Sequence, residues 1–174
     1  MTIAAERTRT VQAYRVYIKA TPQAIWDAIT KPEWTAKYGY AGMVDYELRP
    51  GGKFRVHANE GMKAFGMPDI ISDGEVIQAD PPRTLVQTWR MLMSPEMAAE
   101  GFTRLMYTIE AARGGVTKLT VTHDLTGASK FAAVLAGESE LEGAGGGWSE
   151  VLSGLKTLLE TGQPLPFQSG PPQN

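Results

Sequence analysis

The fold of this chain is decided by the segment GWSEVLSGLKTLLETG, residues 147–162. Its large apolar residues recur at spacings of three and four and form one broad face of a helix. They are Trp148, Val151, Leu152, Leu155, Leu158 and Leu159. Gly162 then ends the helix. A long helix with such a face must bury it, and we expect it to pack against the concave face of a sheet.

The residues that precede this helix supply the sheet. Short runs alternate between apolar and polar residues, as half-buried antiparallel strands do. The runs cover residues 11–19, 43–48, 53–58, 71–78, 84–91, 104–111 and 116–124. Residues rich in Gly and Pro connect several of them, including 49–52, 80–82 and 113–115. We therefore predict an α+β domain with six or seven mostly antiparallel strands around the final helix.

A short helix follows the first strand. Thr21 can cap it, and Pro22 at its first position lacks only an N–H that would have no partner anyway. Pro32 interrupts the pattern, and a second short helical turn carries Trp34 and Tyr38. The predicted domain covers residues 11–162, with loosely ordered tails at 1–10 and 163–174.

Composition excludes several classes of protein. The 174 residues contain 17 Lys and Arg against 19 Asp and Glu, so no strong field for a nucleic acid follows. No apolar run approaches the ~18 residues of a membrane span, and the first residues have no secretory apolar segment. We therefore expect a soluble, cytoplasmic protein with no nucleic-acid partner.

The chain has no cysteine and only two histidines, His57 and His123. This removes disulfides, thiolate metal sites and Cys nucleophiles. The spacings of common metal, phosphate-binding and Ser-nucleophile motifs are also missing. We predict no metal and no cofactor.

Strand periodicity separates the two histidines. His123 shares a face with Leu119 and Val121, while the next residue, Asp124, points away. His123 is thus the only candidate for a polar anchor or proton-transfer group inside, although a partly buried histidine satisfied by a backbone group or by water is the simpler interpretation. His57 lies opposite the apolar residues of its strand, so we expect it to face solvent.

Several motifs recur in a characteristic order and spacing. They are VYIKATPQAIWDAIT (16–30), RPGGKFR (49–55), TWR (88–90), KLTVTH (118–123), GW (147–148) and LKTLLE (155–160). Together they resemble the START/Bet v-like (SRPBCC) superfamily, and in particular its bacterial branch similar to heat-shock-protein-90 ATPase activator homologues. The resemblance implies a helix-grip fold, in which a curved sheet wraps the C-terminal helix and leaves a cavity. It implies no single activity, because members include hydrophobe carriers, cyclases, hydrolases and co-chaperones.

Large adaptable side chains are the candidates for the wall of such a cavity. Methionines and Phe65 in the 61–68 connection, and methionines and Phe102 in the connection after residue 91, should be tucked against the core or a pocket mouth. Aromatic residues add polar tips that could orient a ligand. The predicted ligand-binding residues are Trp34, Tyr38, Tyr40, Phe54, Met67, Trp89, Met91, Tyr107, His123 and Trp148.

Three functions remain open from the sequence. The first is binding of a small hydrophobic or amphipathic molecule in the cavity. The second is a cyclase- or hydrolase-like enzyme that uses His123, with Tyr107, Arg90 or Asp124 nearby, although no convergent pair is evident. The third is a co-chaperone-like interaction. A homodimer is compatible with all three.

Overall fold

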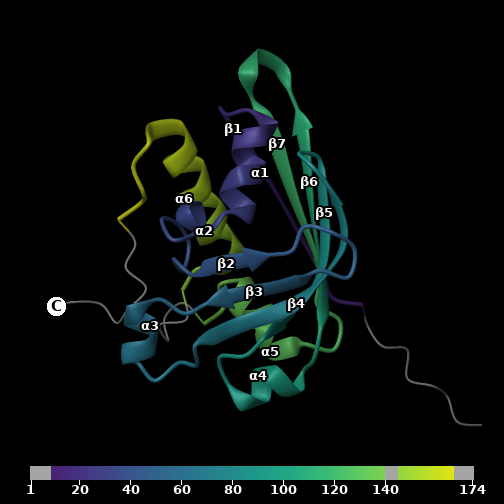
Figure 1. The fold of residues 1–174 in the computed structure, drawn as a ribbon, viewed down its shortest axis with the longest axis vertical. Helices are drawn as coiled ribbons and strands as arrows, with labels where there is room; N and C mark the ends of the chain where they lie inside the picture. The colour runs from purple at the N-terminus through teal and green to yellow at the C-terminus, as the bar shows by residue number, and fades with distance from the viewer. Residues whose placement is uncertain (1–8, 140–144, 167–174) are drawn as a thin grey trace, which may run out of the picture.

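A curved antiparallel sheet forms the frame of the structure, a computed structural model that describes residues 9–139 and 145–166 (Figure 1). Within these residues the sheet has seven strands in the order β1-β7-β6-β5-β4-β3-β2. They are β1 (Val11–Ile18), β2 (Met43–Tyr46), β3 (Lys53–His57), β4 (Ile70–Asp80), β5 (Thr84–Met91), β6 (Thr103–Ala111) and β7 (Thr117–Asp124). Every predicted strand is present; half of the strand ends fall at the expected residue, and the others shift by one or two residues.

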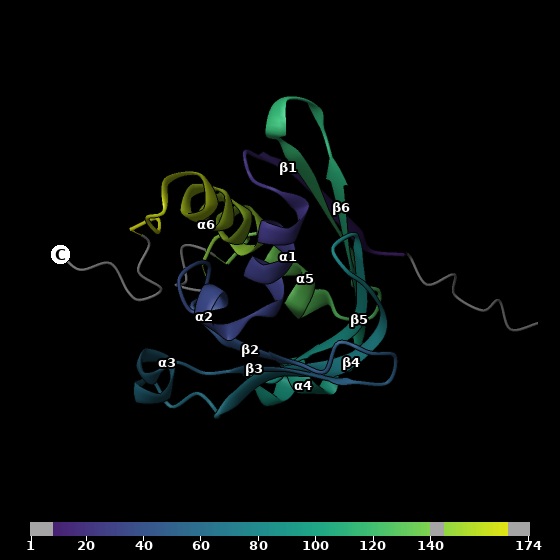
Figure 2. The same ribbon diagram turned by 45° about the horizontal axis from the view of Figure 1, so that its top comes forward.

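The helices lie mainly on the concave side of this sheet. Figure 2 shows α1, α2, α5 and α6 within the curve, with β2–β4 beneath them and β5–β6 to one side. The helices are α1 (Pro22–Thr30), α2 (Pro32–Thr35), α3 (Glu60–Ala64), α4 (Pro95–Ala99), α5 (Ser129–Leu135) and α6 (Gly147–Thr161), and a 3₁₀ turn spans Arg113–Gly115. The predicted α+β, helix-grip architecture is confirmed.

Helix α6 has the expected apolar face. Trp148, Leu152, Leu155 and Leu158 are buried, and α6 packs against β1 and α1. At the C-terminal end, Gly162 adopts the predicted left-handed conformation, and its N–H donates to the carbonyl of Leu158. The apolar face of α6 therefore covers part of the concave side of the curved sheet.

The beginning of α6 depends on Gly147. This glycine has a φ of +66°, and a Cβ atom there would lie 2.1 Å from the carbonyl oxygen of Leu135. Backbone of α5 and backbone of α6 thus approach more closely than any side chain would allow. Gly147 ends a glycine-rich run, residues 143–147, of which 143 and 144 lie outside the described residues. Its described end is a tight packing contact.

Local signals in the first strand and helix have the expected effects. Ile18 is completely buried while Tyr17 is 56% exposed, as the alternation predicts. The Thr21 hydroxyl accepts a hydrogen bond from the Ala24 N–H and caps α1, and Pro22 occupies the first turn. These two elements therefore form from sequence signals that act over only a few residues.

Two connections that the sequence analysis treated as loops contain short helices. Asn59 caps α3 by accepting from the Met62 N–H, and Ser94 caps α4 by accepting from the Met97 N–H. The expectation that every large apolar residue there is tucked in is wrong for Phe65 and Phe102. Phe65 is 70% exposed at the C-terminal end of the short α3.

Phe102 is also exposed, and it contacts a cation instead of the core. The guanidinium of Arg90 lies 4.6 Å from the centre of the Phe102 ring. Arg90 is itself held by two hydrogen bonds to the Asp73 carboxylate. This cation–π contact gives the ring a partner at the surface.

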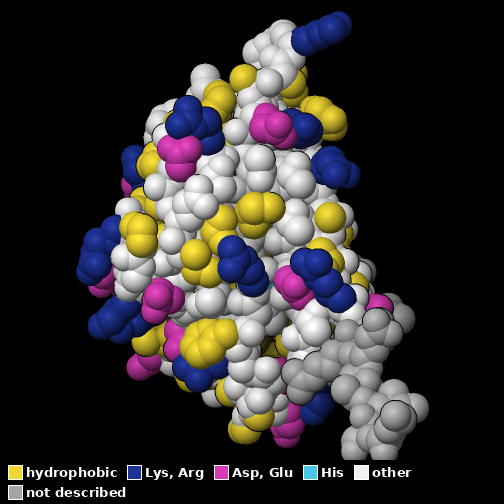
Figure 3. Space-filling model, turned by 90° about the vertical axis from the view of Figure 1, so that its right-hand side faces the viewer, with side chains coloured by type: hydrophobic (Ala, Val, Ile, Leu, Met, Phe, Trp, Pro, Cys, Tyr) yellow, Lys and Arg dark blue, Asp and Glu magenta, His cyan; other side chains and the backbone are white. Residues whose placement is uncertain are grey.

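The surface carries mixed charge. On the face in Figure 3, basic and acidic side chains are interspersed among uncharged ones, which agrees with the near-balance of the composition. Among the described residues, no helix is both long and apolar enough to cross a membrane. Of the terminal segments expected to be loosely ordered, only 9–10 and 163–166 lie within the described residues.

Candidate functional site

A cavity of about 200 Å³ lies between the sheet and the helices. Its wall is almost entirely apolar, and none of its lining residues carries a charge. Seven aromatic residues contribute: Tyr38, Tyr40, Tyr46, Phe54, Trp89, Tyr107 and Trp148. Methionines 62, 91, 93 and 97 and several aliphatic side chains complete it. Such a wall suits an apolar molecule.

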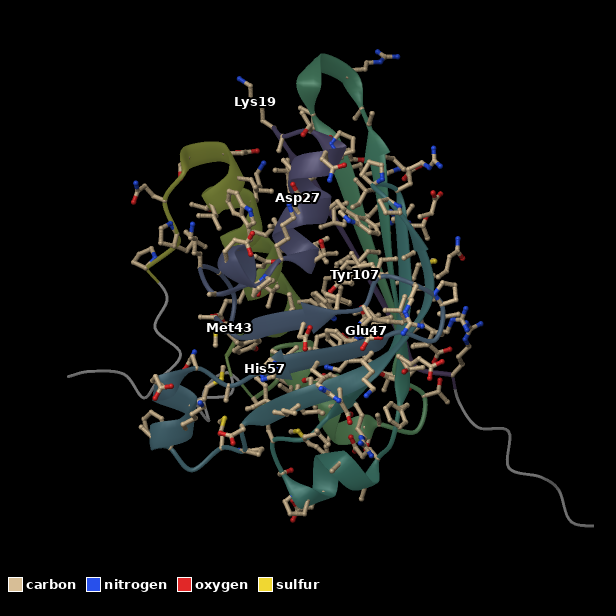
Figure 4. The ribbon with its side chains drawn as sticks, viewed as in Figure 1. Lys19, Asp27, Met43, Glu47, His57 and Tyr107 are labelled. Atoms are coloured by element: carbon tan, nitrogen blue, oxygen red, sulfur yellow. The ribbon has the colours of Figure 1, made fainter. Side chains whose placement is uncertain are left out.

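Seven of the ten predicted ligand-binding residues line this cavity. They are Tyr38, Tyr40, Phe54, Trp89, Met91, Tyr107 and Trp148. They come from five separate parts of the chain, and the curvature of the sheet brings them together. Figure 4 shows one of them, Tyr107, in the interior between the sheet and the helices.

The other three lie outside the lining. Trp34 on α2 is partly buried against the main core, and the ammonium of Lys37 lies 5.1 Å from its ring. Met67 packs on a small cluster formed by Ala58, Met62 and Ile71. His123 lies behind the wall and is completely buried.

The aromatic side chains of the wall form a continuous arc. Ring centres are 4.8 Å apart for Tyr46 and Phe54, and 5.9 Å apart for Phe54 and Trp89. The arc continues from Trp89 to Trp148 at 5.8 Å and from Trp148 to Tyr107 at 6.1 Å. Three of these four contacts are edge-to-face, a favourable geometry for aromatic pairs. The rings of the arc therefore support one another.

His123 supports this arc from behind through a chain of hydrogen bonds. The Thr103 hydroxyl donates to the Trp89 carbonyl, so its oxygen is free to accept from Nε2–H of His123, 2.7 Å away. The indole N–H of Trp148 donates to Nδ1 of His123 at 3.4 Å. The hydrogen-bond network thus assigns one neutral tautomer to the histidine, with both ring nitrogens occupied.

The surroundings of His123 also keep it neutral. Its ring stacks on Trp89 with centres 5.5 Å apart and meets Phe131 edge-on. Burial lowers the pKa of His123 from 6.5 to about 3, and the Asp124 carboxylate acts weakly in the opposite direction. A neutral ring with no free nitrogen has no proton to exchange with a molecule in the cavity.

The other groups considered for catalysis do not converge with His123. Arg90 binds Asp73, and Asp124 accepts hydrogen bonds from Thr126 and Arg9 on the outer side. His57 is partly exposed and lies 3.8 Å from the Asp45 carboxylate. The cavity therefore contains no acid–base pair among the residues proposed from sequence.

Most hydroxyl groups of the wall already have partners. The Tyr38 hydroxyl donates to the carbonyl of Ala28 at 2.8 Å, and the Tyr46 hydroxyl donates to Oε1 of Gln87 at 2.6 Å. Burial raises the pKa of both phenols, and the Gln87 hydrogen bond only partly offsets this for Tyr46.

Tyr107 differs from these two phenols. Burial raises its pKa well above 10, and nearby Tyr46 and Tyr38 add to the effect. Its hydroxyl makes no hydrogen bond with any described residue. The phenol is therefore a neutral donor that faces the cavity without a protein acceptor.

Sequence reasoning missed two residues of this region, Tyr46 and Gln87. Period two along β2 places Tyr46 on the inner face with Val44, and period two along β5 places Gln87 between Leu85 and Trp89. A glutamine at a core position of a strand is the signal that could have identified it, since buried polar residues are informative.

Nothing in the described part of the chain resembles a metal centre. No group of three or more His, Asp or Glu side chains comes together there. The cavity wall also lacks carboxylates, so its chemistry is that of aromatic rings, thioethers and a few hydroxyl groups.

Comparisons with known proteins agree with this architecture. The family model described as "Activator of Hsp90 ATPase homolog 1-like protein" matches residues 19–160. A comparison with curated proteins finds no match.

Several solved structures have a similar fold. Protein MLL2253 from Mesorhizobium loti is 20% identical with a TM-score of 0.61, over 86% of this chain and 96% of its own. The Aha1 dimer from Colwellia psychrerythraea is 18% identical with a TM-score of 0.58, over 88% and 98%. CalU16 from Micromonospora echinospora is 20% identical with a TM-score of 0.56, over 91% and 86%.

Proposed function

The chain belongs to the Activator of Hsp90 ATPase homolog 1-like family, within the SRPBCC superfamily, and we propose that it binds a small hydrophobic or amphipathic molecule in the cavity between its sheet and α6. The observation that carries the proposal is the cavity itself, which is walled by aromatic and thioether groups and contains no charge. A solid core of this composition would leave no such space.

The volume limits the size of the ligand. A dry cavity of about 150 Å³ is sufficient for benzene, and pockets for drug-sized molecules begin at about 300 Å³. At about 200 Å³, this cavity fits one substituted ring or a small fused pair of rings. Methionine side chains on one side can adjust to different shapes.

A calorimetric titration with indane, a small bicyclic hydrocarbon, tests the proposal. We expect saturable binding at one site. Val44→Phe should abolish it, because Val44 lines the cavity and the larger ring fills it. The matched control is Val11→Phe on the exposed edge strand, which should bind as the original does. Absence of indane binding, or equal binding by both variants, would contradict the proposal.

A second candidate function is stimulation of a heat-shock ATPase. The description of the matching family carries this candidate, together with the similar fold of an HSP90 activator from Plasmodium falciparum. The turnover of ATP by Hsp90, measured with and without this chain, tests it. An unchanged rate at saturating chain would remove this candidate and leave ligand binding untouched.

The partner we propose besides the ligand is a second copy of the chain. The support is the structure from Colwellia psychrerythraea, which is a dimer and covers 88% of this chain. One chain has a mass of 18.9 kDa, and light scattering should give about twice that mass. A mass equal to one chain at high concentration would contradict self-association.

A further inference from the structure

Three hydrogen-bond donors in the cavity region have no acceptor among the described residues. The Tyr107 hydroxyl makes no hydrogen bond with them, although the residue is only 9% exposed and lines the cavity. Nε2 of Gln87 and Nε1 of Trp89 are fully buried and also lack partners among the described residues. Buried polar groups are nearly always satisfied, so these two N–H groups near the Tyr107 hydroxyl need an explanation.

The sheet places these donors together. Leu85 of β5 pairs with Tyr107 of β6, and Gln87 pairs with Leu105, so Tyr107 and Gln87 are diagonal neighbours on one face. Trp89 follows two residues later on the same face. Diagonal neighbours in adjacent strands are within reach of long side chains. Tyr107 and Trp89 both line the cavity, and Gln87 lies between them along the sheet but outside the lining.

Two acceptors of this region already take part in hydrogen bonds within the protein. Oε1 of Gln87 accepts from Tyr46, and the Thr103 hydroxyl oxygen accepts from His123. A bound molecule can supply a further acceptor. Leaving buried donors without one is unfavourable, and a bound molecule that supplied one would gain affinity and orientation.

The acceptor must be uncharged. The cavity wall has no cationic side chain that could compensate a carboxylate or phosphate. An anion would lose its hydration and gain only neutral hydrogen bonds, which is unfavourable in an apolar site. A carbonyl or ether oxygen has no such cost, and it can accept two hydrogen bonds.

We propose that the ligand is a small, uncharged molecule with a carbonyl-type oxygen, and that the Tyr107 hydroxyl donates to this oxygen at the inner end of the cavity. This inference rests on the proposed ligand binding and specifies its chemistry. Trp89 also lines the cavity and has an indole N–H without a partner among the described residues, so it is the candidate for a second donor. The aromatic arc contacts the rest of the molecule.

Three probes of nearly equal shape test the inference by calorimetry: indane, 1-indanone and indane-1-carboxylate. We expect 1-indanone to bind about fivefold more tightly than indane, as one neutral hydrogen bond provides. The carboxylate should bind most weakly. Equal dissociation constants for indane and 1-indanone, or tightest binding of the carboxylate, would overturn the inference.

A pair of variants assigns the effect to one hydroxyl. Tyr107→Phe removes only the proposed donor, so the ratio of the two dissociation constants should fall to about one. Tyr17→Phe is the control, because that tyrosine is exposed on the outer face of β1, away from the cavity, and its hydroxyl should leave the ratio unchanged. A fivefold preference that persists in Tyr107→Phe would overturn the role of Tyr107.

The experiment separates this inference from the function on which it rests. If none of the three probes binds, ligand binding itself is contradicted and the inference fails with it. If indane and 1-indanone bind with equal affinity, the cavity is a binding site and only the carbonyl-type ligand is contradicted.

Discussion

Two regions on the same concave face of the sheet differ in whether their polar groups have hydrogen-bond partners. At His123, both ring nitrogens have a partner: Trp148 donates to the ring, the ring donates to Thr103, and Thr103 donates to the Trp89 carbonyl. Around Tyr107, a hydroxyl, an amide N–H and an indole N–H have none among the described residues. Trp89 and Trp148 belong to both regions.

The difference assigns different roles to the two groups of side chains: those around His123 stabilise the fold, and those around Tyr107 can bind a ligand. A satisfied network fixes side chains and has no capacity for a ligand, whereas unsatisfied donors beside a cavity have that capacity. His123 was the most conspicuous candidate in the sequence, yet it holds the wall in place. Tyr107, one of many aromatic residues in the sequence, faces the cavity.

Removal of His123 should have the largest effect on stability. His123→Ala leaves a cavity and removes the partners of Thr103 and Trp148, so we expect a loss of about 3 kcal/mol in the free energy of unfolding. Urea denaturation measures it. His57→Ala on the partly exposed strand face is the control, with a change below about 0.5 kcal/mol. Equally small losses for both variants would contradict the claim that the His123 network stabilises the fold.

Mild acid should weaken the His123 region next. The folded state keeps His123 neutral because burial lowers its pKa to about 3, while the unfolded chain binds a proton near pH 6.5. The unfolded state thus holds more protons in this window, and stability falls as the pH decreases. From pH 6.5 to about pH 5 the loss should be about 1.6 kcal/mol.

Denaturant titrations at several pH values measure this loss. His123→Gln, which cannot be protonated, should flatten the dependence, and His57→Ala should not. A dependence that is unchanged in His123→Gln would show that other groups cause it, and the neutral histidine in the folded state would be contradicted.

Loss of the Tyr107 hydroxyl should have the smallest effect on stability. Because this hydroxyl has no partner, Tyr107→Phe should change the free energy of unfolding by less than about 0.5 kcal/mol. Tyr38→Phe, which removes the hydrogen bond to Ala28, should cost about 1 kcal/mol. A larger loss for Tyr107→Phe than for Tyr38→Phe would show that the Tyr107 hydroxyl is used within the protein.

Much of the fold follows from signals that are local in the sequence. The stripe of α6, the Thr21–Pro22 helix start and the alternation of the strands all reappear in the structure. Short helices α3 and α4 escaped notice because each spans five residues, too few for an apolar periodicity. Their caps, Asn59 and Ser94, were the only available signals.

The site was less accessible from the sequence, because its geometry depends on pairing between strands. Alternation correctly places Tyr107 and His123 on the inner face, but only the register shows that one faces space and the other is enclosed by Thr103, Trp148 and Phe131. Whether a donor has an acceptor depends on distances of a few tenths of an ångström. No pattern of residue types encodes that.

The central claim, that a small neutral molecule occupies the cavity, can be tested most directly by following the four indole N–H signals of the protein by NMR during a titration with 1-indanone. Trp89 and Trp148 line the cavity, whereas Trp26 and Trp34 do not, so the chain contains its own controls. We predict saturable shifts of the Trp89 and Trp148 signals with little change in the other two. No saturable shift, or equal shifts of all four signals, would contradict the claim.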